Sequence, residues 1–324
     1  MEVRQFVDGC DVAQVLLVRD VEPRRKRDGA EFLRLELGDR TGSLSAMVWD
    51  DIDSVREVCR AGEPVHVTGR YEVSQRWGGR LNLTTLRSAR ADEYSPEALL
   101  DGPARDATQM ERDLRELLAT IHNPHLRRLL KLVFDDASPI WASYRDAPAA
   151  KRYHQAYRHG LLEHCLTVAQ AVSALSAIFQ GIDRDIAVTG ALLHDIGKLE
   201  SYELAGGAIE MSDDGRLIGE IPLGYYRVRR AIERLDGFPA ELAQALAHII
   251  LSHHGSLEHG SPVVPCTREA TLVHMMDNLG GRLGTFDRLE KQLPAGEQWS
   301  AFDKALGGGA YFAARPDEQQ RQAA

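Results

Sequence analysis

The chain has 324 residues, 44% of them hydrophobic and 27% charged, with a formal net charge of −9. This is the composition of an ordinary globular protein, and the length predicts two domains. The sequence contains no apolar run near the roughly 20 residues that span a bilayer and no signal-peptide core, so we expect no membrane association. Its four cysteines stand far apart without a CxxC pair, which argues against a disulfide framework and favours a cytoplasmic protein.

The first ninety residues carry short β-rich segments, several of them alternating between apolar and polar side chains. The expected strands cover residues 12–18, 31–37, 43–49, 63–73 and 80–86, and a short helix is expected over 51–62. Three strands, a helix and two further strands are the order of an OB-fold, a small five-stranded barrel. We therefore expect an OB-fold nucleic-acid-binding domain over residues 1–92.

Two expected loops of this barrel are basic. One is EPRRKRDG and the other SQRWGGR, and OB-folds commonly bind single strands with these two loops. The expected strand-binding residues are Arg24, Arg25, Lys26, Arg27, Arg76, Trp77 and Arg80. For either loop alone, a solvated charge run and a tryptophan covering apolar surface is the simpler explanation. Their occurrence together favours binding to a single strand, despite the acidic net charge.

From about residue 95 the apolar residues recur at helical spacing. The sequence predicts a helical connector over 93–147, an all-α domain over 148–313 and a disordered tail over 314–324. The helical part contains His164, His194, Asp195, the pair His253 and His254, and Asp277 on separate expected helices, with His194 and Asp195 adjacent on one of them. Each residue alone is weak evidence of a site. Together, imidazoles and carboxylates without a thiolate suit a divalent metal held inside a helical bundle.

The motifs GLLEH, LLHDIGK, HIILSHHG, EHGSP and MMDNL occur in the order typical of HD-domain metal phosphohydrolases. More closely, PAAKRYHQAYRHGLLEH and LSHHGSLEHGSPVVPCTREATLVHMMDNL resemble the YhaM-type 3′-to-5′ exoribonucleases, which join an OB-fold to an HD domain. The resemblance covers most of residues 1–310 and is strongest between 148 and 280.

The resemblance implies a metal site of His164, His194, Asp195 and Asp277, with Asp195 bridging to a second ion held by His253 and His254. Relatives usually supply a further histidine where this chain has Glu220, which we include among the expected ligands. Gln155 stands where relatives often have a second histidine, and Gly280 where many have an aspartate. The expected cofactor is a divalent metal, two ions in number, with Mn²⁺ first and Fe, Co, Ni, Zn or Mg as alternatives.

The implied activity is metal-dependent 3′-to-5′ hydrolysis of single-stranded RNA, or of single-stranded DNA, to 5′-mononucleotides. Asp195 and Lys198 are the expected catalytic residues, although Lys198 is equally well explained as an exposed helix lysine. Lys151, His154 and His248 are expected near the substrate. Two alternatives stay open: a phosphohydrolase of small nucleotides, and a non-catalytic strand-binding protein with a degraded second metal site. The oligomeric state is open, with a homo-oligomer as one alternative.

Overall fold

The computed structural model describes residues 1–26, 29–74, 78–100, 102–103, 105–151, 155–205, 208–291, 293 and 297–313. These residues divide into two compact units, one within residues 1–101, 206–208 and 285–324 and the other within 102–205 and 209–284. The predicted tail over 314–324 lies outside the described residues. The domain boundaries given above remain predictions.

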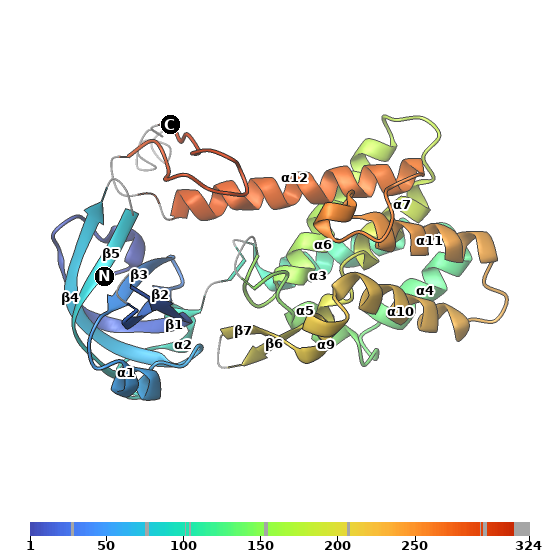
Figure 1. The fold of residues 1–324 in the computed structure, drawn as a ribbon. Coiled ribbons are helices and arrows are strands. Elements are labelled where there is room, and N and C mark those ends of the chain that lie inside the picture. Colours follow the sequence, from blue (N-terminus) through green and yellow to red (C-terminus); the bar gives the residue numbers. More distant parts are fainter. Residues whose placement is uncertain are drawn as a thin grey trace. The chain divides into compact units, whose positions relative to one another are not determined.

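The N-terminal strands form a closed barrel in the order β1-β2-β3-β5-β4 (Figure 1). The elements are β1 (Asp11–Arg25), β2 (Glu31–Asp39), β3 (Gly42–Val48), α1 (Ile52–Val58), β4 (Pro64–Ser74) and β5 (Gly78–Ser88). Neighbouring strands pair antiparallel, except that β3 and β5 close the barrel in parallel. The helix between the third and fourth strands completes the predicted OB-type order, so this part of the fold prediction is confirmed.

Alternation places the apolar residues inside the barrel. Leu33, Leu35 and Leu37 of β2 are fully buried, whereas the residues between them are partly exposed. Strand β1 is longer than predicted and continues to Arg25, so Arg24 and Arg25 lie on a strand and not in a loop. Beyond the register with β4, which ends at Leu17, β1 pairs with β2 alone. The proline of this extension, Pro23, has no N–H to donate, which is tolerated where a strand lacks a second neighbour.

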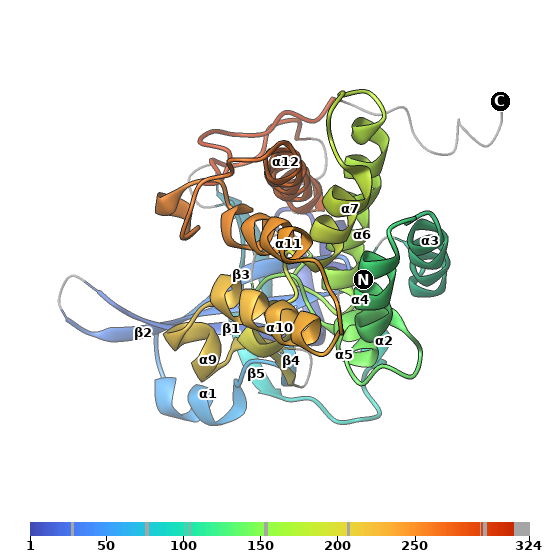
Figure 2. The same ribbon diagram turned by 90° about the vertical axis from the view of Figure 1, so that its right-hand side faces the viewer.

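The second unit is helical, as predicted. Its elements are α3 (Ala107–Ala119), α4 (Pro124–Phe134), α5 (Trp141–Asp146), α6 (Gly160–Ser176), α7 (Arg184–Leu193), α8 (Lys198–Ser201), α9 (Asp213–Leu217), α10 (Glu220–Glu233), α11 (Ala240–Ser252) and most of α12 (Arg268–Lys291), with a two-stranded sheet of β6 (Tyr202–Ala205) and β7 (Ala208–Met211). A short helix, α2 (Pro96–Leu99), follows the barrel. Helix α7 packs against α4, α6 and α11, and α10 packs against α11 (Figure 2).

One hydrophobic core joins these helices. Helices α3 and α4, which the sequence predicts as part of a connector, contribute Met110, Leu114, Leu126 and Leu129 to the same core as α6, α7 and α11. The apolar faces of α6 and α7 are wide enough that both helices are buried along most of their length. Polar residues on these helices are therefore enclosed by the core. Among the described residues, none of the helices combines the length and hydrophobicity needed to cross a membrane.

Candidate metal centre and strand-binding surface

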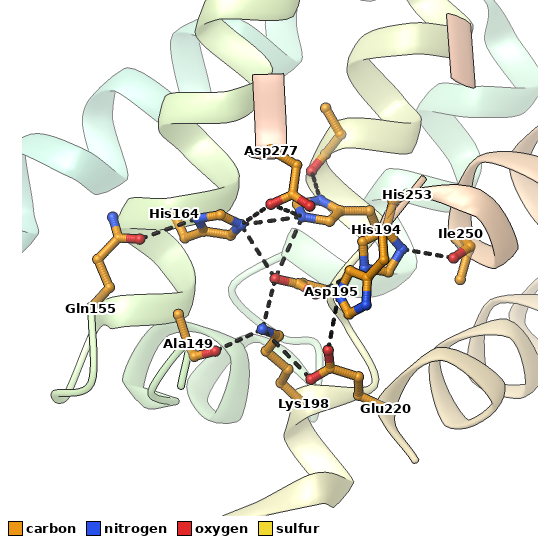
Figure 3. Close-up of polar contacts among 12 residues, drawn as sticks. Ala149, Gln155, His164, His194, Asp195, Lys198, Glu220, Ile250, His253 and Asp277 are labelled. Carbon is orange, nitrogen blue, oxygen red and sulfur yellow. Dashed lines mark hydrogen bonds and ion pairs between the residues drawn. The ribbon is translucent and has the colours of Figure 1, made fainter. Parts of the chain in front are cut away.

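Five of the seven expected ligands are placed by five different helices or their ends, and His254 follows His253 in the turn after α11. His164 lies on α6, His194 caps the C-terminus of α7, Glu220 begins α10, His253 caps the C-terminus of α11 and Asp277 lies on α12. The seventh, Asp195, follows His194 in the turn before α8. Residues distant in the sequence thus converge in one cluster of the helical unit (Figure 3).

The turn at His194 and Asp195 differs from the prediction, which put both residues within one regular helix. Helix α7 ends at Leu193, and the backbone tightens: Ile196 N–H donates to Leu193 O, and Lys198 N–H to Asp195 O. Gly197 makes the turn possible, because a Cβ at this position would lie 2.0 Å from the carbonyl oxygen of Glu220. The turn therefore brings the Asp195 carboxylate toward the start of α10.

The ligand atoms fall into groups whose members lie within 4.8 Å of one another. One group contains His164, His194 and Asp195, a second contains Asp195, Glu220, His253 and His254, and a third joins His194, His253 and Asp277. Asp195 belongs to the first two groups, as expected of a bridging carboxylate. Its Oδ2 is 3.3 Å from His164 Nε2, and its Oδ1 is 3.4 Å from His253 Nε2.

Asp277 completes the side of the cluster near α6 and α7. Its Oδ1 is 3.0 Å from His164 Nε2 and 3.7 Å from His194 Nε2. On the other side of the cluster, His254 Nε2 is 3.3 Å from Glu220 Oε1. Glu220 therefore lies in the same group as Asp195, His253 and His254, and its role as a ligand remains a prediction.

Lys198 is buried and not an exposed helix lysine. Its ammonium donates to the Ala149 carbonyl over 2.7 Å and lies 3.2 Å from Asp195 Oδ2 and 3.5 Å from Glu220 Oε2. Only 7% of the residue is exposed. The lysine therefore connects the two carboxylates of the second group.

Electrostatics keep the carboxyl groups of the cluster ionised. Burial alone would raise the pKa of Asp195, but the Lys198 ammonium and the His194 imidazole outweigh it and hold this pKa well below its usual range. The pKa of Asp277 is also held well below its usual range, because imidazole hydrogen bonds outweigh burial. Against the same burial effect, Lys198 lowers the pKa of Glu220, and the carboxylates raise the pKa of Lys198. Three carboxylates and one ammonium give the cluster a formal charge of −2 before the imidazoles are counted. Although burial opposes it, the Asp195 carboxylate raises the pKa of His194 well above its usual range.

The donor set fits a divalent cation. His164 Nε2 and His194 Nε2 face each other at 3.2 Å, and both approach carboxylate oxygens. Asp195 Oδ1 and His253 Nε2 are buried 3.4 Å apart, and within the part of the chain that the structure describes neither atom forms a hydrogen bond. Buried polar atoms are costly unless something compensates them, and a cation among these lone pairs would do so. Imidazole nitrogens with carboxylate oxygens suit Mn, Fe, Co, Ni or Zn.

The remaining residues expected near the substrate are dispersed. Lys151 pairs with Glu210 of β7 over 2.7 Å. His248 lies outside the ligand groups, where its Nε2 accepts the backbone N–H of Cys266 over 2.8 Å, and burial lowers its pKa. His154 lies outside the described residues. The hydrogen bonds of Lys151 and His248 therefore do not connect these residues to the ligand cluster.

On the barrel, the structure describes four of the seven expected strand-binding residues. Arg24 pairs with Glu22 over 2.6 Å and Arg80 with Glu72 over 3.7 Å, all partly or largely exposed. Arg25 is exposed at the end of β1. Arg27, Arg76 and Trp77 lie outside the described residues.

The fourth, Lys26, lies beside two stacked aromatic residues that the sequence analysis did not name as strand-binding residues. Its Nζ lies 4.9 Å from the ring centroid of Trp49, which is 48% exposed. Trp49 stacks on Phe32 with centroids 4.6 Å apart and an angle of 26° between the rings. The alternation of β2 and β3 was a usable signal, since it puts Phe32 and Trp49 out of phase with the buried leucines and valines.

Comparison with known proteins supports both units. Residues 161–281 match the family model described as "HD domain". The 3′-5′ exoribonuclease YhaM of Geobacillus sp. (strain WCH70) is 29% identical over 291 residues, which cover 89% of this chain and 88% of that protein. YhaM of Bacillus subtilis (strain 168) is 28% identical over 291 residues, 89% of this chain and 90% of the relative.

A third relative, YhaM of Listeria monocytogenes serotype 4b (strain F2365), is 29% identical over 298 residues, 90% of this chain and 92% of its own. These alignments are too long to lie within one unit of the chain. Residues 161–281 therefore resemble an HD domain, and the predicted resemblance of the chain to the YhaM-type 3′-to-5′ exoribonucleases is confirmed over about nine-tenths of its length.

Proposed function

We propose that this protein is a metal-dependent 3′-to-5′ exonuclease that shortens single-stranded RNA and releases 5′-mononucleotides. The observation that carries the proposal is the pair of ligand groups that share Asp195. The relatives named above are exoribonucleases, which favours RNA as the substrate.

In this proposal, His164, His194, Asp195 and Asp277 hold one divalent ion, and Asp195, Glu220, His253 and His254 hold a second. Mn²⁺ is the expected ion. Such a metal pair supplies an activated water nucleophile and positive charge at the phosphate. Buried imidazoles and carboxylates on separate helices give this site a fixed geometry before substrate arrives.

In this proposal, Lys198 positions two of the metal ligands. Its ammonium donates a hydrogen bond to the Ala149 carbonyl and forms ion pairs with Asp195 and Glu220, so these contacts are with the ligands and the main chain. The ammonium holds the two carboxylates in place and reduces the repulsion between them. We therefore assign Lys198 a positioning role within the centre.

The barrel binds the strand in this proposal. Trp49 and Phe32 offer a stacking surface for a base, and Lys26 offers positive charge beside it. The pairs Arg24–Glu22 and Arg80–Glu72 are exposed, and such pairs contribute only about 0–1 kcal/mol, so phosphates can compete for the guanidinium groups. Because the barrel is part of the same chain, it raises the concentration of RNA near the helical unit. A cytoplasmic location and a homo-oligomer remain predictions.

The test uses full-length protein stripped of metal with a chelator and reloaded with Mn²⁺. We expect 5′-labelled single-stranded RNA to shorten stepwise from its 3′ end and to yield 5′-mononucleotides only after reloading. DNA of the same sequence and free nucleotides are the comparison substrates. Preferential hydrolysis of free nucleotides would favour a small-nucleotide phosphohydrolase. RNA that is bound by metal-loaded protein and never shortened would instead favour a strand-binding protein.

A further inference from the structure

His164 differs from the other imidazoles of the centre in what orients its ring. The Nδ1 atoms of three histidines face backbone carbonyl oxygens: His194 faces Ala191 at 2.7 Å, His253 faces Ile250 at 2.7 Å and His254 faces His259 at 2.9 Å. His164 Nδ1 instead lies 3.1 Å from the side-chain oxygen Oε1 of Gln155 (Figure 3). A backbone carbonyl can only accept a hydrogen bond, whereas a side-chain amide can turn either its oxygen or its nitrogen toward the ring.

A buried carboxylate decides which way the Gln155 amide turns. Glu163 is 8% exposed, and its Oε2 accepts from Gln155 Nε2 over 3.4 Å and from the Tyr157 hydroxyl. A carboxylate has no proton to donate, so the amide nitrogen must face Glu163. The amide oxygen then faces His164, whose Nδ1 must carry the proton and whose Nε2 presents its lone pair to Asp195 and Asp277.

The backbone at Gln155 is held in an unusual conformation. Its φ of +55° lies in the left-handed region, which costs a non-glycine residue of order 1–3 kcal/mol and is retained where the surroundings demand it. Its carbonyl accepts from the Ala149 N–H over 3.1 Å, and a Cβ on Gly160 would lie 2.0 Å from that oxygen. These contacts fix the position from which the amide reaches His164.

We propose that Glu163 and Gln155 are positioning residues that set the tautomer of His164, so that Nε2 is available as a metal ligand. This inference rests on the proposed function, because it takes His164 to bind a metal. It adds Gln155 and Glu163, which lie outside the ligand set, to the residues that build the centre. Gln155 stands at a position where this chain departs from its relatives. Outer-shell partners of a metal-bound histidine typically contribute about 10- to 100-fold in metal affinity.

Two variants separate this role from simple packing. Gln155→Leu keeps much of the side-chain volume and removes the acceptor for His164 Nδ1. The double variant Gln155→Glu with Glu163→Gln exchanges the two groups. The carboxylate at position 155 then accepts a hydrogen bond from His164 Nδ1, and the amide at position 163 donates a hydrogen bond to the carboxylate at position 155. The net charge and the direction of the bond at His164 are retained. Gln180→Leu, at an exposed position, is the matched control.

The readouts are Zn²⁺ affinity by calorimetry and the imidazole ¹⁵N shifts of His164 in full-length protein. We expect Gln155→Leu to bind Zn²⁺ about 10- to 100-fold more weakly, and the exchanged variant and control to stay near wild type. Equal Zn²⁺ affinity in wild type and Gln155→Leu would overturn the inference, as would an exchanged variant no better than Gln155→Leu.

Failure of the proposed function looks different. If His164 is no ligand, its Nε2 shift will not respond to Zn²⁺ in the wild-type protein. A normal Nε2 response together with unchanged affinity in Gln155→Leu would leave the metal centre intact and refute the positioning role alone. Circular dichroism of each variant shows whether a loss of affinity comes from unfolding.

Discussion

The barrel and the helical unit place their charged groups in opposite ways. In the helical unit, His164, His194, Asp195 and His253 are each at most 3% exposed and lie within the apolar core. Among the described residues of the barrel, the buried side chains are apolar apart from Asp39, and Arg24 and Arg80 pair with acids on the outside. Desolvated charges interact strongly and keep a fixed geometry, whereas exposed pairs exchange partners easily. The contrast suits chemistry in one unit and binding of a variable strand by the other.

The largest expected effect comes from Asp195→Asn, because this residue belongs to both ligand groups. We expect hydrolysis of labelled RNA to fall more than about 100-fold, since even an outer-shell partner is worth 10- to 100-fold. RNA binding through the barrel should persist in a filter-binding assay. Asp113→Asn, which removes the partner of Arg105 elsewhere, is the control. Unchanged hydrolysis would place the chemistry outside the cluster.

A smaller effect is expected from Glu220→Gln, which alters the second ligand group alone. The neutral amide is a weaker ligand, so bound Mn²⁺ should fall from two ions toward one, with about 10- to 100-fold slower hydrolysis. Elemental analysis gives the stoichiometry. Glu233→Gln removes a glutamate that pairs with Arg229 outside the cluster and should change neither the stoichiometry nor the rate. Two tightly bound ions in Glu220→Gln protein would show that Glu220 is not a ligand.

Trp49→Ala tests whether the barrel binds the RNA strand. Stacking of one base on an aromatic ring is worth about 1–3 kcal/mol, and Phe32 remains, so we expect RNA affinity to fall about 5- to 20-fold. The turnover number at saturating RNA should stay unchanged, because the metal centre is untouched. Trp299→Ala is a matched control, since Trp299 is also exposed. A lower turnover number with normal affinity would contradict the division of roles.

The smallest effect concerns pH and an exposed pair beside the barrel. Hydrogen bonds from Arg87 lower the pKa of Glu93 to about 2. A lowered folded-state pKa means that this pair stabilises the fold at a pH above the ordinary glutamate pKa of 4.5 and loses that contribution as the pH falls toward 2. The melting temperature of Glu93→Gln should therefore be slightly below wild type at pH 7, with the gap closing below pH 4.5. A gap that widens on acidification would refute this assignment.

Local patterns in the sequence predicted much of this structure. Period-two segments located the strands of the barrel, and helical spacing located the helices that carry His164 and Asp277. The ligand types were predictable because imidazoles and carboxylates are rare together in apolar segments. Glu220 was found only through a departure from relatives, since a glutamate at the start of a helix has no distinctive pattern.

Other features depend on contacts between distant residues. The extension of β1 to Arg25 depends on its pairing with β2, and the burial of Lys198 depends on Glu220 and the Ala149 carbonyl. The Glu163–Gln155–His164 chain depends on a left-handed backbone at Gln155. Nothing in the local sequence specifies such partners. The alternation of the strands could have predicted that Phe32 and Trp49 lie outside the barrel core. It could not have predicted that the two rings stack on each other.

Gly197 gives the second ligand group an unusual dependence on the main chain. The start of α10 approaches so closely that an added methyl group would collide with the Glu220 carbonyl at 2.0 Å and the Gly224 nitrogen at 2.5 Å. The spacing between Asp195 and Glu220 is therefore set by a direct backbone contact between Gly197 and the start of α10, with no side chain between the two segments. Drift at neighbouring surface positions can proceed without moving these oxygens, whereas a single alanine here would separate them while leaving every ligand in the sequence.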